Sequence, residues 1–444
     1  MLQKYYPYYR RLMTLALPLV MTQAGQVVVS LVDNAMVGRV GTQELASASF
    51  ANSVFTIILV FGMGISFAIT PMIGHAIGAS DRSAISRIIK NSWVLGTASA
   101  LFLAMLCYLG SLLMPFLGQP EKVVELAIPY FRILAVSLIP FMGFMVLKQI
   151  GEGLGNTMMA MIATVASNLL NILLNWVLIF GHWGAPALGL NGAGIATLIA
   201  RILMPFLLYY GLKNIKAYRG YFVKTPEVHV AWHEIKKLLT IGLPIAFQLV
   251  LEVSIFAIGA VMMGWIGDVP LAAHQVALGL GSMTFMISNG VAQATTIRVS
   301  YQIGEKNDYG LRMASFSAMH LVLFFMGLSC IGFYVLRYQL PLIFTPDVAV
   351  VNQAAILLIV AAIFQLFDGL QVVCLGILRG MADVKVPMLI AAVCYLIIGI
   401  PVSYICAFTF GMGPVGIWVG FVVGLALAGI AFFVRIWKLL YGDK

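Results

Sequence analysis

Charged residues are scarce in this chain: they make up 9% of its 444 residues, while hydrophobic residues make up 61%. A soluble domain is about 25% charged, so the composition excludes soluble enzymes and soluble binding domains. Nearly every window of about 20 residues is apolar enough to cross hydrocarbon. Cysteine is also scarce, and all five cysteines lie in apolar stretches without CxxC spacing, which argues against disulfides and zinc sites; they are Cys107, Cys330, Cys374, Cys394 and Cys406.

The start of the chain and its net charge both point to the lipid bilayer. The first apolar run, residues 12–32, is too long for the core of a signal peptide, so we expect it to be the first membrane span. The net charge of +10 comes from basic residues in short loops between apolar runs, where membrane topology explains them. We therefore expect the lipid bilayer as a partner, and no nucleic acid.

Twelve apolar segments, bounded by charges or by Gly/Pro turns, predict an all-α integral membrane protein. The segments are about two to three times the length of a barrel strand and do not alternate in polarity, so helices are favoured over a barrel. The expected spans are 12–36, 46–74, 89–114, 124–147, 157–181, 189–211, 236–263, 270–298, 312–336, 350–377, 385–409 and 415–437.

Basic residues gather on one predicted side of the membrane. By the positive-inside rule both termini are cytoplasmic, and we expect a multi-pass protein of a bacterial inner membrane that works as a monomer. Besides the 213–237 connector, the residues on that side are Lys4, Arg10, Arg11, Arg82, Arg87, Lys90, Arg435, Lys438 and Lys444, against Arg39, Lys122 and Arg337 on the other.

The two halves of the chain resemble each other. We predict two pseudo-symmetric six-helix lobes, residues 1–212 and 236–444, joined by a cytoplasmic linker, 213–235. Because six is an even number, the lobes have the same orientation and their pseudo-twofold axis runs along the membrane normal. A shift of 226 residues superposes Leu17 and Pro18 on Leu243 and Pro244, Gly38 on Gly264, Gly41 on Gly267, Gly64 on Gly290 and Gly78 on Gly304, whereas Gly189 and Gly194 match Gly411 and Gly416 at a shift of 222.

Ionisable side chains inside the predicted spans are the candidates for function, since each costs about 2.5–3.5 kcal/mol at the centre of a membrane helix. Glu252 gives the clearest signal, with Gln248 one helical turn before it on the same face. Such a carboxyl group either binds a proton or sodium ion, or is a neutral acid hydrogen-bonded between helices. The five ionisable residues inside the predicted spans are Asp33, Arg132, Arg201, Glu252 and Asp368.

Asp368 lies on a polar stripe in the tenth span, between Gln365 and Gln371. A stripe of this kind faces protein or water rather than lipid. Glu252 belongs to the same predicted lobe, and the two carboxyl groups can converge there. A carboxyl group removed from water exchanges a proton more readily near physiological pH, which suits a coupling group.

A second set of polar residues lies in the first lobe. Asp33 shares a helix face with Gln26, which the 226-residue shift places opposite Glu252. Asp33 is either functional or an interfacial residue near the end of its helix. Arg201 can pair with Asp33, whereas Arg132 is expected to be structural and to extend to the membrane interface. Further amides and a hydroxyl on nearby spans are Asn168, Asn171, Asn175 and Thr197.

Four segments resemble the multidrug and toxic compound extrusion (MATE) family, most closely its NorM-like branch: LVDNAMVGRVG at 31–41, NILLN at 171–175, EVSIFA at 252–257 and FQLFDGLQVVCLGILRG at 364–380. The resemblance covers the whole chain. It implies that Glu252 and Asp368 form a cation-coupling site, and that Asp33, Asn171, Asn175 and Thr197 form a second polar cluster. One position departs from the pattern, because Phe364 stands where the family's sodium site often has a tyrosine.

These observations predict an antiporter coupled to Na⁺ or H⁺, without a cofactor, that exports organic, cationic drugs by alternating access. The accessory residues expected around its sites are Gln26, Gln248, Phe364, Gln365, Gln371 and Arg201. The alternative is a flippase for a lipid-linked precursor, which should hold an anionic diphosphate with basic groups. An integral-membrane enzyme is not expected, because the sequence offers no convincing nucleophile, metal cluster or phosphate loop.

Overall fold

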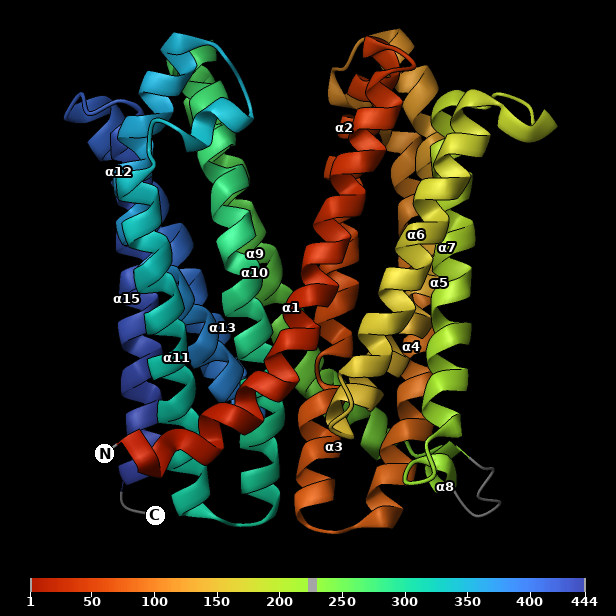
Figure 1. The fold of residues 1–444 in the computed structure, drawn as a ribbon, viewed down its shortest axis with the longest axis vertical. Helices are drawn as coiled ribbons and strands as arrows, with labels where there is room; N and C mark the ends of the chain where they lie inside the picture. Colours follow the sequence, from red (N-terminus) through yellow and green to blue (C-terminus); the bar gives the residue numbers. More distant parts are fainter. Residues whose placement is uncertain (1, 223–229, 443–444) are drawn as a thin grey trace. The chain divides into compact units, whose positions relative to one another are not determined.

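The computed structural model describes residues 2–222 and 230–442, and every element of secondary structure in them is helical. Twelve helical segments are long and apolar enough to cross a membrane, which confirms the predicted all-α fold and the number of spans (Figure 1). Residues 223–229 of the predicted linker, and Lys444 among the predicted cytoplasmic charges, lie outside the described residues.

Six spans occupy the first half of the chain. The linker region begins where the last of them ends and contains the short α8 (Arg219–Phe222). The six are formed by α1 (Leu2–Gly38), α2 (Thr42–Ser66) continued by α3 (Ile69–Gly78), α4 (Arg82–Leu113) continued by η1 (Met114–Leu117), α5 (Glu121–Gly153), α6 (Met158–Phe180) and, after η2 (His182–Gly184), α7 (Gly189–Asn214).

The second half also contains six spans. The fifth of them, which is the eleventh span of the chain, is built from consecutive short α and π segments. The six spans are formed by α9 (Trp232–Ile266), α10 (Asp268–Gly304), α11 (Asp308–Val335), α12 (Val348–Gly380) after η3 (Leu340–Ile343), the consecutive α13 (Lys385–Ala392), η4 (Val393–Gly399), α14 (Ile400–Tyr404) and η5 (Ile405–Thr409), and α15 (Pro414–Tyr441).

The loops confirm the 226-residue register of the repeat. Asp81 caps α4 by accepting from the backbone N–H of Ala84 at 2.8 Å, and Asn307 caps α11 by accepting from that of Gly310 at 2.8 Å. A side-chain acceptor at this position satisfies an N–H group that the first helical turn leaves open. The same loop chemistry therefore begins the third span of each half.

The chain folds into two compact units. The first unit contains residues 21–246, and the second unit contains residues 1–20 and 247–444. Their boundaries fall inside α1 and α9, 226 residues apart and two residues after Pro18 and Pro244. Proline interrupts the hydrogen bonding of a helix. The predicted lobes, which divide the chain at the linker, stay a prediction.

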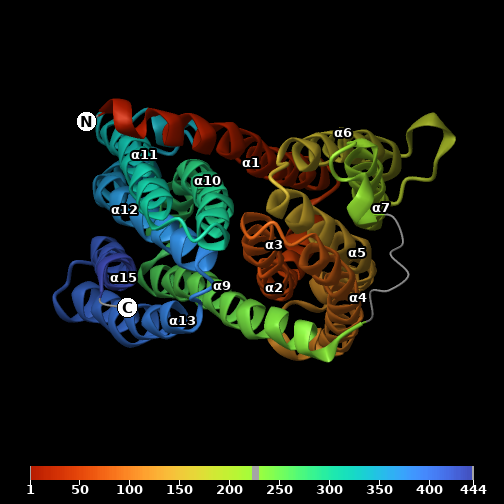
Figure 2. The same cartoon turned by 90° about the horizontal axis from the view of Figure 1, so that it is seen from below.

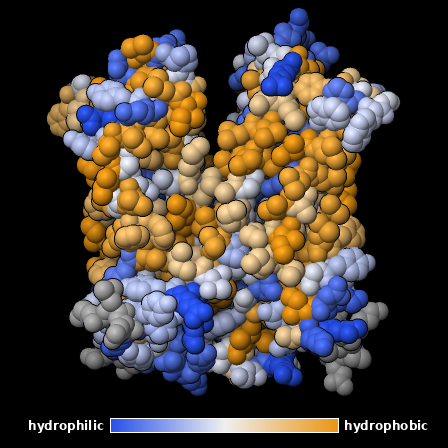
Figure 3. Space-filling view, viewed as in Figure 1, coloured by the Kyte–Doolittle hydropathy of each residue, from blue (hydrophilic) through white to orange (hydrophobic). Residues whose placement is uncertain are grey.

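One helix lies at the centre of each unit. In the first unit α5 packs against α2, α4 and α7, and in the second unit α12 packs against α10, α11 and α15 (Figure 2). Apolar residues cover the middle of the helices, and polar residues gather towards their ends (Figure 3). Side chains on α5 and α12 are therefore those most fully surrounded by protein.

Candidate functional site

The first unit contains a cavity of about 390 Å³ between α1, α2, α5, α6 and α7. Amide side chains form part of its wall, and aromatic, methionine, aliphatic and hydroxyl side chains line the rest. Several predicted residues meet here, although they come from three separate spans; they are Gln26, Asp33, Asn168, Asn171, Thr197 and Arg201.

Asp33 is held by the asparagines of α6. The Asn175 side chain donates to Oδ1 of Asp33. The Asn171 amide, in the orientation that satisfies both of its ends, donates to Asp33 Oδ1 at 3.0 Å and accepts from the Thr197 backbone N–H at 3.3 Å. The structure thus brings the four residues of the predicted polar cluster together.

Arg201 lies in the same cavity and interacts electrostatically with Asp33, as the predicted pairing requires, but its guanidinium is held by other side chains. Its Nη1 donates to Ser137 Oγ at 2.8 Å, and its guanidinium lies over the rings of Phe55 and Phe141, 5.2 and 4.9 Å from their centroids. The aromatic faces and the hydroxyl satisfy the cation. Helix periodicity places Arg201 on the cavity face, but it does not identify the partner on another helix.

A different arrangement surrounds Glu252 in the second unit. The Gln248 amide, one turn earlier on α9, donates to Glu252 Oε2 at 3.2 Å. The other end of that amide, Oε1, accepts from Arg379 Nη2 of α12 at 2.6 Å. The guanidinium is therefore joined to the carboxyl group through one glutamine side chain.

Asp368 completes this group from the middle of α12. Its side chain is buried and interacts electrostatically with Glu252, which also interacts with Arg379. Glu252 therefore interacts with one group of like charge and one of opposite charge. A negative charge on Asp368 disfavours the ionised form of Glu252, and the positive charge of Arg379 favours it.

The glutamines beside Asp368 point to different neighbours. Gln371 Nε2 donates to the Tyr395 hydroxyl at 2.6 Å, and Gln365 Oε1 accepts from Thr284 Oγ1 at 2.6 Å. Among the described residues no hydrogen-bond partner reaches Gln371 Oε1, although this atom is buried. An oxygen of this kind is available to a cation.

Phe364 lies in an aromatic group next to Asp368. Its ring centroid is 5.6 Å from that of Trp418 and 6.1 Å from that of Phe256. The Trp418 indole N–H donates to His274 Nδ1 at 3.1 Å. Tyr395, on the eleventh span, interacts electrostatically with Glu252 and Asp368.

Sequence reasoning missed Arg379, Tyr395 and a buried ion pair in α5. The pair joins Lys148 Nζ to Glu152 Oε1 at 2.9 Å. The predicted spans ended at 147 and 377, so Lys148, Glu152 and Arg379 were assigned to loops, whereas the helices continue to Gly153 and Gly380. Tyr395 gave no signal because it is one tyrosine in an apolar run.

Comparison with known proteins finds a family match in each half of the chain. The model of the MatE family matches residues 18–177 and 244–405, one stretch in each half of the chain. The chain belongs to the MATE family. The prediction of a multi-pass transporter rather than an enzyme is thereby confirmed.

Relatives of this MATE protein match over almost their full length. A probable multidrug resistance protein NorM of Mannheimia succiniciproducens is 33% identical, with 97% of this chain and 94% of that protein covered. The multidrug resistance protein MdtK of Edwardsiella ictaluri is 32% identical, with 98% and 96% covered.

Solved MATE structures share the fold. A mutant of the Vibrio cholerae MATE transporter VcmN superposes with a TM-score of 0.90 at 20% identity, covering 100% of this chain and 99% of that one. The eukaryotic MATE transporter AtDTX14 gives a TM-score of 0.88 at 20% identity, with 98% of each chain covered.

Proposed function

We propose that this protein exports organic, cationic drugs in exchange for Na⁺ or H⁺, by alternating access, from the cytoplasm across a bacterial inner membrane. The observation that carries the proposal is the group formed by Glu252, Asp368 and Arg379 in the second unit. The names of the relatives, which are multidrug resistance proteins, support the substrate class.

The second unit fits the coupling cation. Sodium prefers oxygen ligands, as a hard cation does. Glu252 and Asp368 offer carboxylate oxygens, and Gln371 adds a buried carbonyl oxygen without another partner among the described residues. A proton needs only the carboxyl groups. When no free cation is bound, Arg379 provides the counter-charge of Glu252 through Gln248.

The first unit suits the organic substrate. Its cavity of about 390 Å³ has the size of a small drug site. Asp33 attracts a cation, and the ring of Tyr130, which also lines the cavity, is an aromatic surface against which a flat cation can pack. Amides of α6 hold Asp33 in place and leave its second oxygen for the ligand.

The concentration gradient of the coupling ion drives the exchange, and the membrane potential adds about 2.3 kcal/mol per 100 mV for each net positive charge that moves inward. A cation that enters from outside binds the carboxyl pair and replaces Arg379 as the counter-charge of Glu252. Each chain contains both sites, so a monomer is enough. Cytoplasmic termini would place the basic loops on the anionic inner leaflet.

A lipid-linked precursor is less suited to this chain. Its diphosphate would need several free basic groups in the cavity. Among the described residues that line the first-unit cavity, Arg201 is the only one with a fixed positive charge, and its guanidinium is already held by Ser137 and two rings.

Proteoliposomes provide the test. Vesicles loaded with a fluorescent organic cation are exposed to a Na⁺ gradient or a pH gradient separately, and transport of the dye is followed. We expect one of the two gradients to accelerate efflux of the dye beyond the rate without a gradient. Transport that neither gradient accelerates would rule out cation coupling, while the absence of dye transport would rule out drug export.

A further inference from the structure

The first unit has a second and larger cavity, which is lined by other residues than the Asp33 site. It is a groove of about 740 Å³ between α3, the start of α4 and the first turns of α9. From α9 it is lined by His233, Glu234, Lys236, Lys237, Thr240 and Ile241, which share one face of that helix at i, i+3, i+4 and i+7 spacing. Neither the proposed ion site nor the drug cavity uses these residues.

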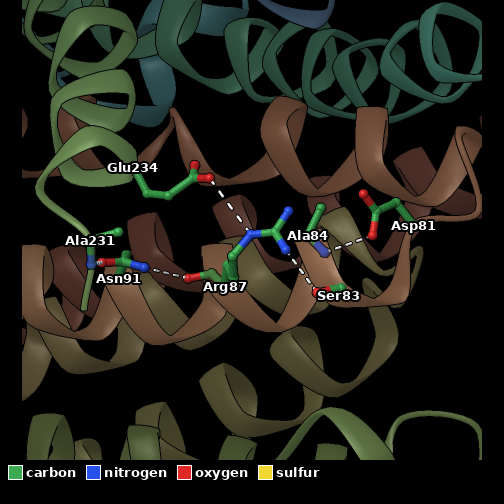
Figure 4. A network of polar contacts seen from close by, with 7 residues as sticks. All are labelled: Asp81, Ser83, Ala84, Arg87, Asn91, Ala231 and Glu234. Atoms are coloured by element: carbon green, nitrogen blue, oxygen red, sulfur yellow. Dashed lines mark hydrogen bonds and ion pairs between the residues drawn. The ribbon is translucent and has the colours of Figure 1, made fainter. Parts of the chain in front are cut away.

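Polar contacts fix the walls of the groove (Figure 4). The side chain of Asn91 on α4 accepts from the backbone N–H of Ala231 at 3.0 Å, immediately before α9 begins. Arg87 donates to Ser83 Oγ at 2.7 Å, and its Nε lies 3.8 Å from Glu234 Oε1 of α9. The first turn of α9 is thus fastened to α4, and the groove between them is preformed.

Both acidic side chains of the groove are already engaged. Glu234 faces Arg87, and the carboxylate of Asp81 caps α4 by accepting from the Ala84 N–H at 2.8 Å. By contrast, the exposed ammonium groups of Lys236 and Lys237 have no hydrogen-bond or ion-pair partner among the described residues. The uncompensated charge of the groove is therefore positive, and it suits an anion.

The remaining wall is apolar. Met72, Ala76, Ile88 and Ile241 line it, and Trp232, with 71% of its surface exposed, stands one turn before Lys236. Lys236 and Lys237 lie within the first two turns of a helix that is long and apolar enough to cross a membrane, and basic side chains at the ends of such helices reach the lipid headgroups. Basic side chains above an apolar wall at this depth match a phosphate headgroup with an acyl chain below it.

We propose that this groove binds the phosphate group of an anionic phospholipid, with Lys236 and Lys237 as its charge partners and the α3–α4 wall as the seat of the acyl chain. Free phosphate has the same charge chemistry but cannot use the apolar wall. The lipid is favoured because the wall and the lysines face one cavity.

The test titrates the full-length protein in detergent with phosphatidylglycerol or phosphatidylcholine and counts bound lipids by native mass spectrometry. We expect phosphatidylglycerol to be preferred, and the double variant Lys236→Gln with Lys237→Gln to bind it about tenfold more weakly or worse. Lys236→Arg with Lys237→Arg keeps both charges and should retain binding. Lys213→Gln with Lys216→Gln removes the same charge outside the groove and should behave as the wild type.

Three outcomes would overturn the proposal. One is equal binding of the two lipids by the wild-type protein, and another is an unchanged affinity in the Gln double variant. In the third, inorganic phosphate at equal concentration displaces phosphatidylglycerol from the wild type, which would assign the groove to free phosphate. Displacement only by a second anionic lipid supports the lipid site.

Discussion

The two units repeat one helix order but treat their acidic groups differently. In the first unit Asp33 lines an open cavity and is held by neutral amides. In the second unit Asp368 is buried, and Glu252 is joined through Gln248 to a guanidinium. Gln26 occupies the position in the first repeat that Glu252 occupies in the second. Under the proposed function, the open cavity of the first unit takes the bulky ligand and the buried carboxyl pair of the second takes the small cation.

The comparison is tested most severely by removing the acids of the second unit. Glu252→Gln and Asp368→Asn keep the side-chain volume but lose the charge that holds a cation. Each should therefore reduce gradient-driven dye transport to the level of vesicles without protein. Efflux is measured with equal amounts of reconstituted protein. If both variants transport as the wild type does, the carboxyl pair has no part in coupling.

Asp33→Asn should affect the site of the first unit and leave that of the second unit intact. Loss of one charged partner costs about 1.5–3 kcal/mol, so the affinity for a cationic dye should fall roughly ten- to hundredfold, as measured by fluorescence polarisation. Binding of ²²Na⁺ should not change, since Glu252 and Asp368 lie in the other unit. A loss of sodium binding with intact dye binding would reverse the assignment of the two sites.

Arg379→Gln tests whether the guanidinium in the second unit competes with the coupling cation. Without the competing guanidinium, Glu252 is free for a cation, so the affinity for ²²Na⁺ should rise about tenfold. Arg337→Gln is the control, because it removes a charge of the same unit that lies over Tyr334 and Tyr338. Equal or weaker sodium binding by Arg379→Gln would show that Arg379 does not compete with the ion.

Equivalent glycines provide a smaller structural comparison. A Cβ on Gly64 would lie 2.3 Å from the backbone Cα of Ala246, whereas one on Gly290 would lie 2.4 Å from the side-chain Cγ2 of Val20. Backbone yields less than a side chain, and overpacking costs about 1–3 kcal/mol. Gly64→Ala should therefore lower the Tm in detergent more than Gly290→Ala does, and the opposite order would show that α9 gives way more easily than α1.

Much of this was visible in the sequence, because membrane helices have a length and composition that a one-dimensional pattern records. The spans, the repeat and the carboxyl groups follow from it. Contacts between helices do not, because they depend on rotation and crossing geometry. Asp33 accepts a hydrogen bond from Asn175, 142 residues away, whereas Arg201, which interacts electrostatically with Asp33, donates its hydrogen bond to Ser137. Arg379 escaped notice because the hydrophobic pattern fades before the helix ends at Gly380.

Because the unit boundaries fall inside α1 and α9, the first part of each of these helices belongs to a different unit from the rest. Residues 12, 16 and 19 of α1 pack into the core of the second unit, while Ile235, Leu238 and Ala246 of α9 pack into the first. The chain therefore passes between the units only at 20–21 and 246–247. A nick between α7 and α8 would not yield two separable halves: each fragment would keep one helical arm embedded in the other's unit, as exchanged arms hold a domain-swapped dimer together.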